Sequence, residues 1–149
     1  MASILNPTDL SNIKTRIKSI DGNEKALWGR MTVNEMVCHL TDQIRVGTGD
    51  ILSKDISSFA LRNIVKNLVL MGMPTPKGKV MTVPEMNQEK KGTPPTTLEN
   101  DKQLLLDSID KLAGMEDTKP HPAFGKMNRK QWAKLSYLHM DHHLKQFGK

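Results

Sequence analysis

The chain has 149 residues, of which 37% are hydrophobic and 26% charged, a balance that suits one globular domain and excludes a disordered chain of one charge sign. Aromatic residues make up only 4%, and strand-favouring residues form no sustained alternating runs, which argues against an all-β sandwich or barrel. The net charge of +6 is uneven, because residues 118–140 carry five basic and no acidic side chains. That stretch could attract an anion.

The cysteine content and the apolar runs bear on compartment. A single cysteine, Cys38, excludes an internal disulfide framework and a cysteine-rich zinc module, and it fits a reducing compartment. The N-terminal residues lack a basic region followed by an apolar stretch, and no apolar run approaches the ~20 residues of a membrane-spanning helix. We therefore expect a cytoplasmic protein with no membrane segment.

Two amphipathic helices are predicted in the first third of the chain. Apolar residues spaced three and four apart give residues 8–21 one continuous hydrophobic face. Thr32 and Glu35 have the spacing of a capping box and precede a second apolar stripe. This pattern predicts a helix over residues 32–48.

The middle of the chain is less regular. A helix-compatible apolar segment predicts an additional helix between residues 55 and 72. Residues 72–96 hold five of the eight prolines and three of the ten glycines, which predicts a long irregular connection with a short extended piece at residues 79–83.

Helical periodicity returns in the last third, over residues 97–114 and 128–147. Asn128 and Gln131 again have the spacing of a helix-capping pair. Four main helices with a long crossover between the second and the third predict an all-α four-helix bundle that forms a single domain over residues 1–149. The crossover would let the second and third helices lie parallel.

Three of the five histidines fall within the string HMDHHLKQ: His139, His142 and His143. At 100° per residue they project to the same side of the last helix as Trp132, while its lysines point the opposite way, so we expect the histidines to face the interior. His139 and His143 lie one turn apart, the spacing at which two imidazole nitrogens can bind one divalent ion.

A third ligand can come from the second predicted helix. His39 lies on the shoulder of its apolar stripe, beside Gln43, and could reach a site between helices. Three histidines leave coordination positions open to water or substrate, as in a catalytic rather than a closed structural site. The alternative is a metal-free cluster whose imidazoles are satisfied by hydrogen bonds to one another or to carbonyls.

These strings resemble a known superfamily. HMDHHLKQ resembles the HxxHHxxQ signature that closes the DinB-like (damage-inducible) superfamily of small four-helix metalloproteins, and TVNEMVCHL resembles its second-helix segment, which ends in a His-Leu pair. HPAFGKMNRKQW is similar to a subgroup known as a domain of unknown function. The resemblance implies that His39, His139 and His143 bind a divalent metal, with His142 beside the site. Characterised relatives include transferases and an isomerase that use low-molecular-weight thiols.

For other polar residues near the predicted ligands, the sequence gives weaker indications of a functional role. Gln43 and Gln146 lie one turn from predicted ligands and could orient an imidazole or hold substrate, the alternative for both being packing. Cys38 diverges from its neighbour His39 by about 100° on the helix, which favours an inert buried thiol over a nucleophile pair. His121, between two prolines, is expected to fix the loop before the last helix.

The first functional hypothesis is a metal-dependent enzyme that activates a small thiol and acts as a thiol-dependent transferase on a small-molecule substrate. Hydrolysis by metal-bound water is the alternative, because both reactions need the same open position. We expect Zn²⁺ or Ni²⁺ ahead of Mn²⁺ or Fe²⁺.

Two hypotheses from other classes compete with an enzyme. The basic charge suggests nucleic-acid binding, but the aromatic residues are few and the lysines form no recognition motif, which argues against it. A non-catalytic helical interaction domain, such as a homodimer, stays open. The sequence contains no GxSxG elbow, Walker loop, GxGxxG or HExxH motif.

Overall fold

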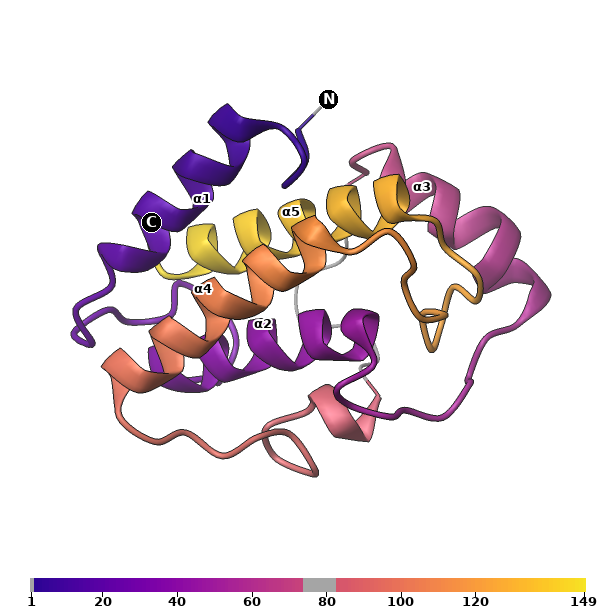
Figure 1. Ribbon diagram of the computed structural model, residues 1–149. Coiled ribbons are helices and arrows are strands. Elements are labelled where there is room, and N and C mark those ends of the chain that lie inside the picture. Colours follow the sequence, from indigo (N-terminus) through magenta and orange to yellow (C-terminus); the bar gives the residue numbers. More distant parts are fainter. Residues whose placement is uncertain (1, 74–82) are drawn as a thin grey trace.

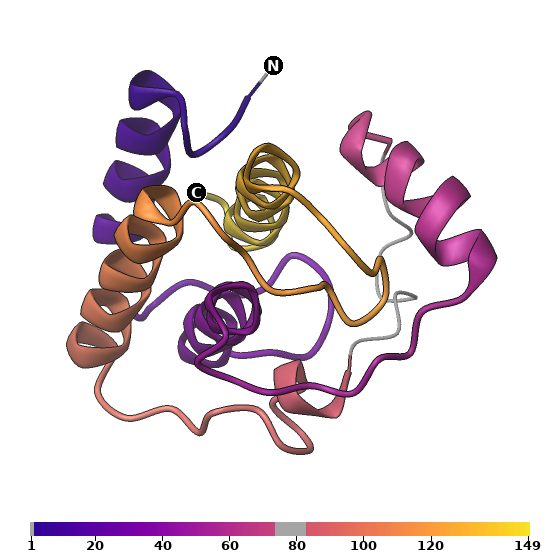
Figure 2. The same cartoon turned by 45° about the vertical axis from the view of Figure 1, so that its right-hand side comes forward.

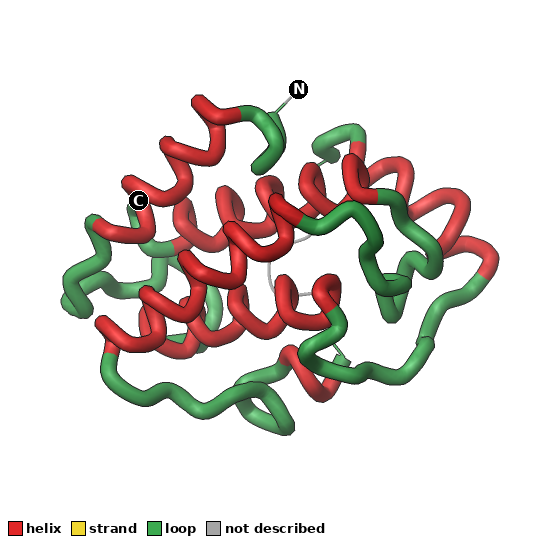
Figure 3. Tube along the Cα trace, in the orientation of Figure 1, coloured by secondary structure: helices red, strands yellow, loops and turns green. Residues whose placement is uncertain are grey.

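The computed structural model describes residues 2–73 and 83–149 and is all-helical within them (Figures 1 and 3), as the sequence predicts. A π-helical segment, η1 (Leu61–Val65), leads directly into α3, and η2 (Pro84–Met86) is a single 3₁₀ turn. The five α-helices are α1 (Pro7–Lys18), α2 (Val33–Thr48), α3 (Lys66–Leu70), α4 (Leu98–Gly114) and α5 (Arg129–Gln146). None of the helices in the described part is long and apolar enough to cross a membrane.

Side-chain caps fix where the helices that carry the site begin. The Thr32 hydroxyl accepts a hydrogen bond from the Glu35 amide, and the Glu35 carboxylate accepts one from the Thr32 amide. Asn128 and Gln131 form the same reciprocal pair at the start of α5. Both predicted capping boxes are confirmed, and they set the rotational phase of the histidines on the two helices.

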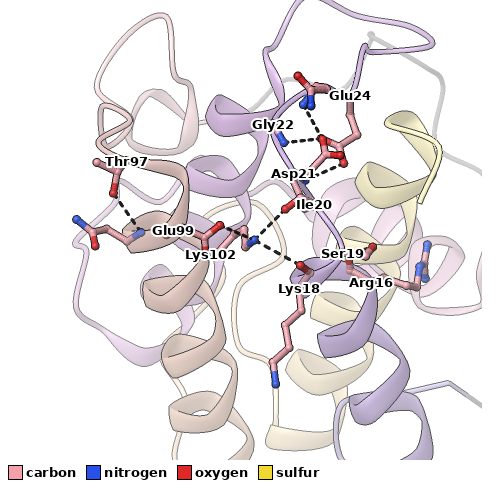
Figure 4. Close-up of polar contacts among 12 residues, drawn as sticks. Arg16, Lys18, Ser19, Ile20, Asp21, Gly22, Glu24, Thr97, Glu99 and Lys102 are labelled. Carbon is pink, nitrogen blue, oxygen red and sulfur yellow. Dashed lines mark hydrogen bonds and ion pairs between the residues drawn. The ribbon is translucent and has the colours of Figure 1, made fainter.

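The first helix ends earlier than its apolar periodicity suggests, at Lys18 instead of residue 21. Figure 4 shows what holds the segment after it: the Lys102 ammonium, on α4, donates to the carbonyl oxygens of Ile20 (2.8 Å) and Lys18 (3.4 Å) and to the Glu99 carboxylate (2.8 Å). A cation at a helix C-terminus satisfies carbonyls that the helix leaves free. Ile20 stays buried although it lies outside the helix.

The four long helices pack in pairs. In Figure 1, α2 and α4 run in the same direction, and α1 and α5 run the opposite way. α2 packs against both α4 and α5, and α1 packs against the same two helices. The main hydrophobic cluster draws on all four, and its fully buried members include Ile13, Ile17, Met36, Leu40, Ile44, Leu105, Ile109, Met140 and Leu144.

A second, smaller hydrophobic cluster joins the crossover to the ends of α2 and α5. Its centre is Trp132, which is fully buried and whose indole N–H donates to the Lys119 carbonyl at 2.8 Å. Gly47 on α2 allows this ring to approach, because a Cβ there would lie 2.9 Å from the indole. Met86 of η2 and Leu70 of α3 pack into the same cluster.

The crossover returns to α4 along α2 and is fastened there by a buried carboxylate. Asp42 accepts hydrogen bonds from the amide and hydroxyl of Thr93, at 2.8 and 2.6 Å, and from the Gln88 side chain at 3.1 Å. The predicted helix between residues 55 and 72 is found over residues 59–70. The extended piece predicted at residues 79–83 lies, apart from Val83, outside the described residues.

The Lys102 contacts yield a stability prediction. Lys102→Met keeps the aliphatic stem but leaves the Lys18 and Ile20 carbonyls without their donor, so we expect the free energy of unfolding to fall by about 1–3 kcal/mol. Lys145→Met, which removes an exposed ammonium paired with Asp141, should change it by less than about 0.5 kcal/mol. Urea denaturation of both variants measures the difference, and equal effects would refute the role given to Lys102.

Candidate metal centre

Three imidazoles from two helices meet in the interior. α2 supplies His39, and α5 supplies His139 and His143. The ring centroids lie 4.9 Å apart for His39 and His139, 4.8 Å for His39 and His143, and 4.7 Å for His139 and His143. One ring nitrogen from each residue lies within 4.8 Å of those of the other two. The structure therefore brings together the three histidines that the sequence singles out.

His39 is held by a carbonyl from the crossover. Its Nδ1 lies 2.7 Å from the carbonyl oxygen of Met86 in η2. Because a carbonyl oxygen only accepts, Nδ1 carries the proton and donates, and the lone pair of this neutral imidazole is on Nε2. That Nε2 faces His139 Nε2 at 3.0 Å.

His143 is held in the same way by a glutamine. Its Nδ1 lies 2.7 Å from Gln146 Oε1, and the Gln146 amide nitrogen donates to the Trp28 carbonyl at 2.6 Å. The bond to Trp28 fixes which end of the amide faces His143, so Nδ1 of His143 is the donor and its Nε2 carries the lone pair. Gly29 leaves room for this arrangement, since a Cβ there would lie 2.7 Å from the Gln146 nitrogen.

His139 completes the cluster and has one ring nitrogen to spare. Its Nδ1 is buried and has no hydrogen-bond partner among the described residues. Without an ion, His139 Nε2 must donate to the His39 Nε2 lone pair, which leaves Nδ1 as a buried, unsatisfied acceptor. With an ion between the rings, both Nε2 atoms present lone pairs to it and the His139 proton sits on Nδ1, which then lacks an acceptor among the described residues. Two nitrogens bound at 2.0–2.1 Å to a tetrahedral ion lie about 3.3 Å apart, close to the observed 3.0 Å.

Burial keeps the three rings neutral. It lowers the pKa of His39, lowers that of His139 well below its usual range and lowers the pKa of His143 to about 3, where repulsion between protonated His143 and His39 would add to the effect. Neutral imidazoles have the lone pairs that a cation needs. The three rings contribute no negative charge, so the donor set fits a divalent ion and leaves its charge to be balanced by a further ligand.

The other predicted site residues occupy different places. Gln146 orients His143, as described. Among the described residues Gln43 makes no hydrogen bond to any of the three imidazoles, and its oxygen accepts instead from the Ser136 hydroxyl at 3.4 Å. The His142 ring lies edge-on to Trp28 at 5.7 Å and 5.0 Å from the His143 ring, outside the three-imidazole cluster.

Two further predictions concern residues near the site. Cys38 is buried, and burial together with the charge of Asp101 raises the pKa of its thiol to about 12, which makes it inert as expected. His121 does fix its loop: its Nδ1 accepts from the amides of Ala123 and Phe124, and its ring stacks on Phe124 at 4.6 Å.

Sequence reasoning missed Met86, Trp28 and Ser136. Met86 and Trp28 act through backbone carbonyls, which every residue type has, so no residue pattern could reveal them. Ser136 carries a detectable signal, because it lies three residues before His139 on the same helix face.

Comparison with known families places the chain. Residues 4–149 match the model of a family described as a protein of unknown function, DUF1569. The chain belongs to this family. Searches of curated proteins and of solved structures found no match. For this DUF1569 protein the function therefore has to be argued from the site itself.

The lowered pKa values predict how stability depends on pH. In the metal-free protein, His143 titrates at about 3 when folded and near 6.5 when unfolded, so the unfolded chain binds more protons in between. The free energy of unfolding should therefore be greatest above pH 6.5 and fall as the pH drops towards 5. The slope is about 1.4 kcal/mol per pH unit for each proton that the unfolded chain binds and the folded chain does not. Urea denaturation after chelation measures this slope. His143→Gln should reduce it, and a stability that stays flat between pH 7 and 5 would contradict the neutral cluster.

Proposed function

We propose that this protein is a metal-dependent enzyme in which His39, His139 and His143 bind one divalent ion through Nε2. The observation that carries the proposal is a pair of hydrogen bonds, from His39 Nδ1 to Met86 and from His143 Nδ1 to Gln146. They leave the lone pairs of both residues on Nε2, directed at the cluster. Histidines that bind metals commonly donate their other ring N–H to an oxygen acceptor in this way. Zn²⁺ or Ni²⁺ suits an all-imidazole donor set better than Mn²⁺ or Fe²⁺.

We further propose that the four long helices form a DinB-like bundle, which would make DUF1569 a branch of that superfamily. The support is the closed ring of packed pairs, α1 with α4, α4 with α2, α2 with α5 and α5 with α1. The long connection between the parallel helices α2 and α4 is also typical of bundles with a crossover.

The reaction that we favour is transfer to or from a low-molecular-weight thiol. When bound, a divalent ion deprotonates a thiol outright and lowers the pKa of a water ligand to about 7. The chain's own residues favour the thiol, because hydrolysis gains from a general base. Asp42 follows His39 by three residues on α2, but its oxygens already accept hydrogen bonds from Thr93 and Gln88. It is therefore not free to activate water.

Gln43 is our candidate for holding the substrate. It lies one turn beyond His39 on α2 and is 2% exposed, yet its amide nitrogen has no partner among the described residues. Ser136 holds the oxygen end of the amide, so the nitrogen end is the one left to donate. A buried donor without a partner costs about 1–3 kcal/mol, and an acceptor atom of a bound substrate would remove that cost.

The charge of the metal-loaded site indicates the charge of the substrate. Three neutral imidazoles around a doubly charged ion favour an anionic ligand such as a thiolate, and the basic stretch at residues 118–134 adds to the attraction. We therefore propose a small anionic substrate, in a cytoplasmic setting that keeps Cys38 reduced.

Metal loading tests the proposal. After chelation and dialysis against Zn²⁺ or Ni²⁺, we expect one ion per chain by elemental analysis, and none in His39→Ala or His143→Ala. Gln146→Leu removes the acceptor of His143 Nδ1 and should weaken binding by about 10–100-fold without abolishing it. The matched His142→Ala keeps the ion, because His142 lies outside the cluster. If His142→Ala lost the ion while the other variants kept it, our assignment of the ligands would be wrong.

Activity is then measured as conjugation of common biological thiols to an electrophilic dye by the metal-loaded protein. We expect turnover that His143→Ala removes and that Lys145→Ala, at an exposed position of α5 outside the basic stretch, leaves intact. Turnover unchanged by His143→Ala would contradict catalysis at this cluster. Hydrolysis of ester or amide substrates without thiol turnover would favour the hydrolase instead.

A further inference from the structure

Residues 83–93 of the crossover form a turn that its own backbone holds together, and we call this stretch the η2 segment. The Pro84 carbonyl accepts hydrogen bonds from the amides of Asn87 and Lys91, both at 3.1 Å. The Asn87 carbonyl accepts one from the Gly92 amide at 2.9 Å. These bonds link the beginning of the segment to its end, so a contact at one end also restrains the other. In Figures 1 and 2 the chain passes from η2 beneath α2 to the start of α4.

Helix α2 binds the η2 segment through two side chains on the same side of the helix. His39 donates from Nδ1 to the Met86 carbonyl at 2.7 Å. Asp42, three residues further along α2, accepts hydrogen bonds from the Gln88 side chain and, with both carboxylate oxygens, from the amide and hydroxyl of Thr93. Residues three apart are neighbours on the surface of a helix. The segment therefore meets a predicted metal ligand and a buried carboxylate together.

The carboxylate of Asp42 depends on the η2 segment for its hydrogen bonds. Asp42 is 0% exposed, and among the described residues all three donors to its oxygens belong to this segment. Gly92 leaves room for one of them, since a Cβ there would lie 2.6 Å from the Gln88 amide nitrogen. Burial of a carboxylate without donors is unfavourable. Displacement of the segment would leave Asp42 unsatisfied, which favours the position in which the segment lies against α2.

A second aspartate binds the crossover by the same chemistry, but outside the η2 segment. Asp101, on α4, accepts from the amide and hydroxyl of Thr96 at 2.8 and 2.7 Å, as Asp42 does from Thr93 at 2.8 and 2.6 Å. Asp101 is also buried. The two contacts differ in what they hold: one fixes the stretch that carries the Met86 carbonyl, and the other fixes the entry into α4.

We infer that Asp42 is a positioning residue for the metal centre. By holding the η2 segment against α2, it keeps the Met86 carbonyl on His39 Nδ1 and thereby keeps the His39 lone pair on Nε2. The inference rests on the proposed function, because it concerns how one of the three ligands is held. The coupling is reciprocal, so binding of an ion by His39 should in turn make the η2 segment bind α2 more tightly.

The first test is the Zn²⁺ affinity of the full-length protein, measured by competition with a chromophoric chelator. Asp42→Asn places an NH₂ donor where one acceptor oxygen stood, and we expect it to weaken Zn²⁺ binding about 10–100-fold. Thr93→Val removes one of the three donors and should weaken binding about two- to tenfold. Thr93→Ser keeps both the hydroxyl and the amide, so it should bind Zn²⁺ as the wild type does. Circular dichroism checks that each variant is folded.

Hydrogen exchange gives a readout that a purely structural role of Asp42 would not change. In the wild type, the amides of the η2 segment should exchange more slowly with Zn²⁺ bound than after chelation. Asp42→Asn, saturated with Zn²⁺, should lose this difference. A wild type whose η2 segment exchanges at the same rate with and without bound Zn²⁺ would contradict the coupling.

The matched control is Thr96→Val, which removes the corresponding hydroxyl from Asp101. It should leave the Zn²⁺ affinity within about twofold of the wild type, because Thr96 lies outside the η2 segment. If Thr96→Val weakened Zn²⁺ binding as much as Thr93→Val, or if Asp42→Asn bound Zn²⁺ as tightly as the wild type, the inference would be overturned while metal binding stood. A folded wild type that binds no Zn²⁺ would overturn the proposed function and this inference together.

Discussion

The hydrogen bonds made by the Nδ1 atoms of His39 and His143 decide what the cluster can do. Helix packing alone brings the rings within 5 Å of one another, but it does not decide which nitrogen of each ring carries the proton. The Met86 carbonyl and the Gln146 amide oxygen make that choice, because each can only accept. With both Nδ1 protons committed, the Nε2 lone pairs point into the cluster, which is the arrangement a cation requires.

Both acceptors depend on segments outside the four long helices. Met86 belongs to the crossover, which Asp42 ties to α2 through Thr93. Gln146 is oriented by the Trp28 carbonyl, in the loop between α1 and α2. The irregular segments therefore serve the site directly, and loosening either of them should disturb the ligands before it disturbs the helical core.

The local parts of the fold follow from the sequence. The capping boxes at Thr32 and Asn128 and the apolar periodicity predict the positions of α2 and α5, and with them the faces on which the histidines lie. α1 ends three residues before residue 21, within the ~2–4 residues by which a boundary read from sequence varies, and the carbonyls at its end are bound by Lys102, a residue 84 positions away from Lys18. Contacts of that range leave no trace in a local pattern.

In the candidate site, too, the features that depend on local helix geometry could be predicted from the sequence, and those that depend on distant contacts could not. Convergence of His39 with the α5 histidines could be predicted from helix faces, and a role for Gln146 from its spacing. The Met86 carbonyl could not, since it is a backbone atom in a proline-rich crossover whose path depends on Asp42 and on packing around Trp132. Gln43 lies one turn from His39 on α2, but its partner Ser136 becomes visible only once α2 and α5 are packed together.

X-ray absorption at the zinc edge of the Zn²⁺-loaded protein tests three-imidazole ligation most directly. We expect a shell of nitrogen and oxygen atoms at about 2.0–2.1 Å with the outer scattering of imidazole rings, and loss of that signature in His39→Ala. A sulfur atom at about 2.3 Å would place Cys38 at the metal, and a spectrum unchanged in His39→Ala would remove His39 from it. Either result would contradict a site built from His39, His139 and His143.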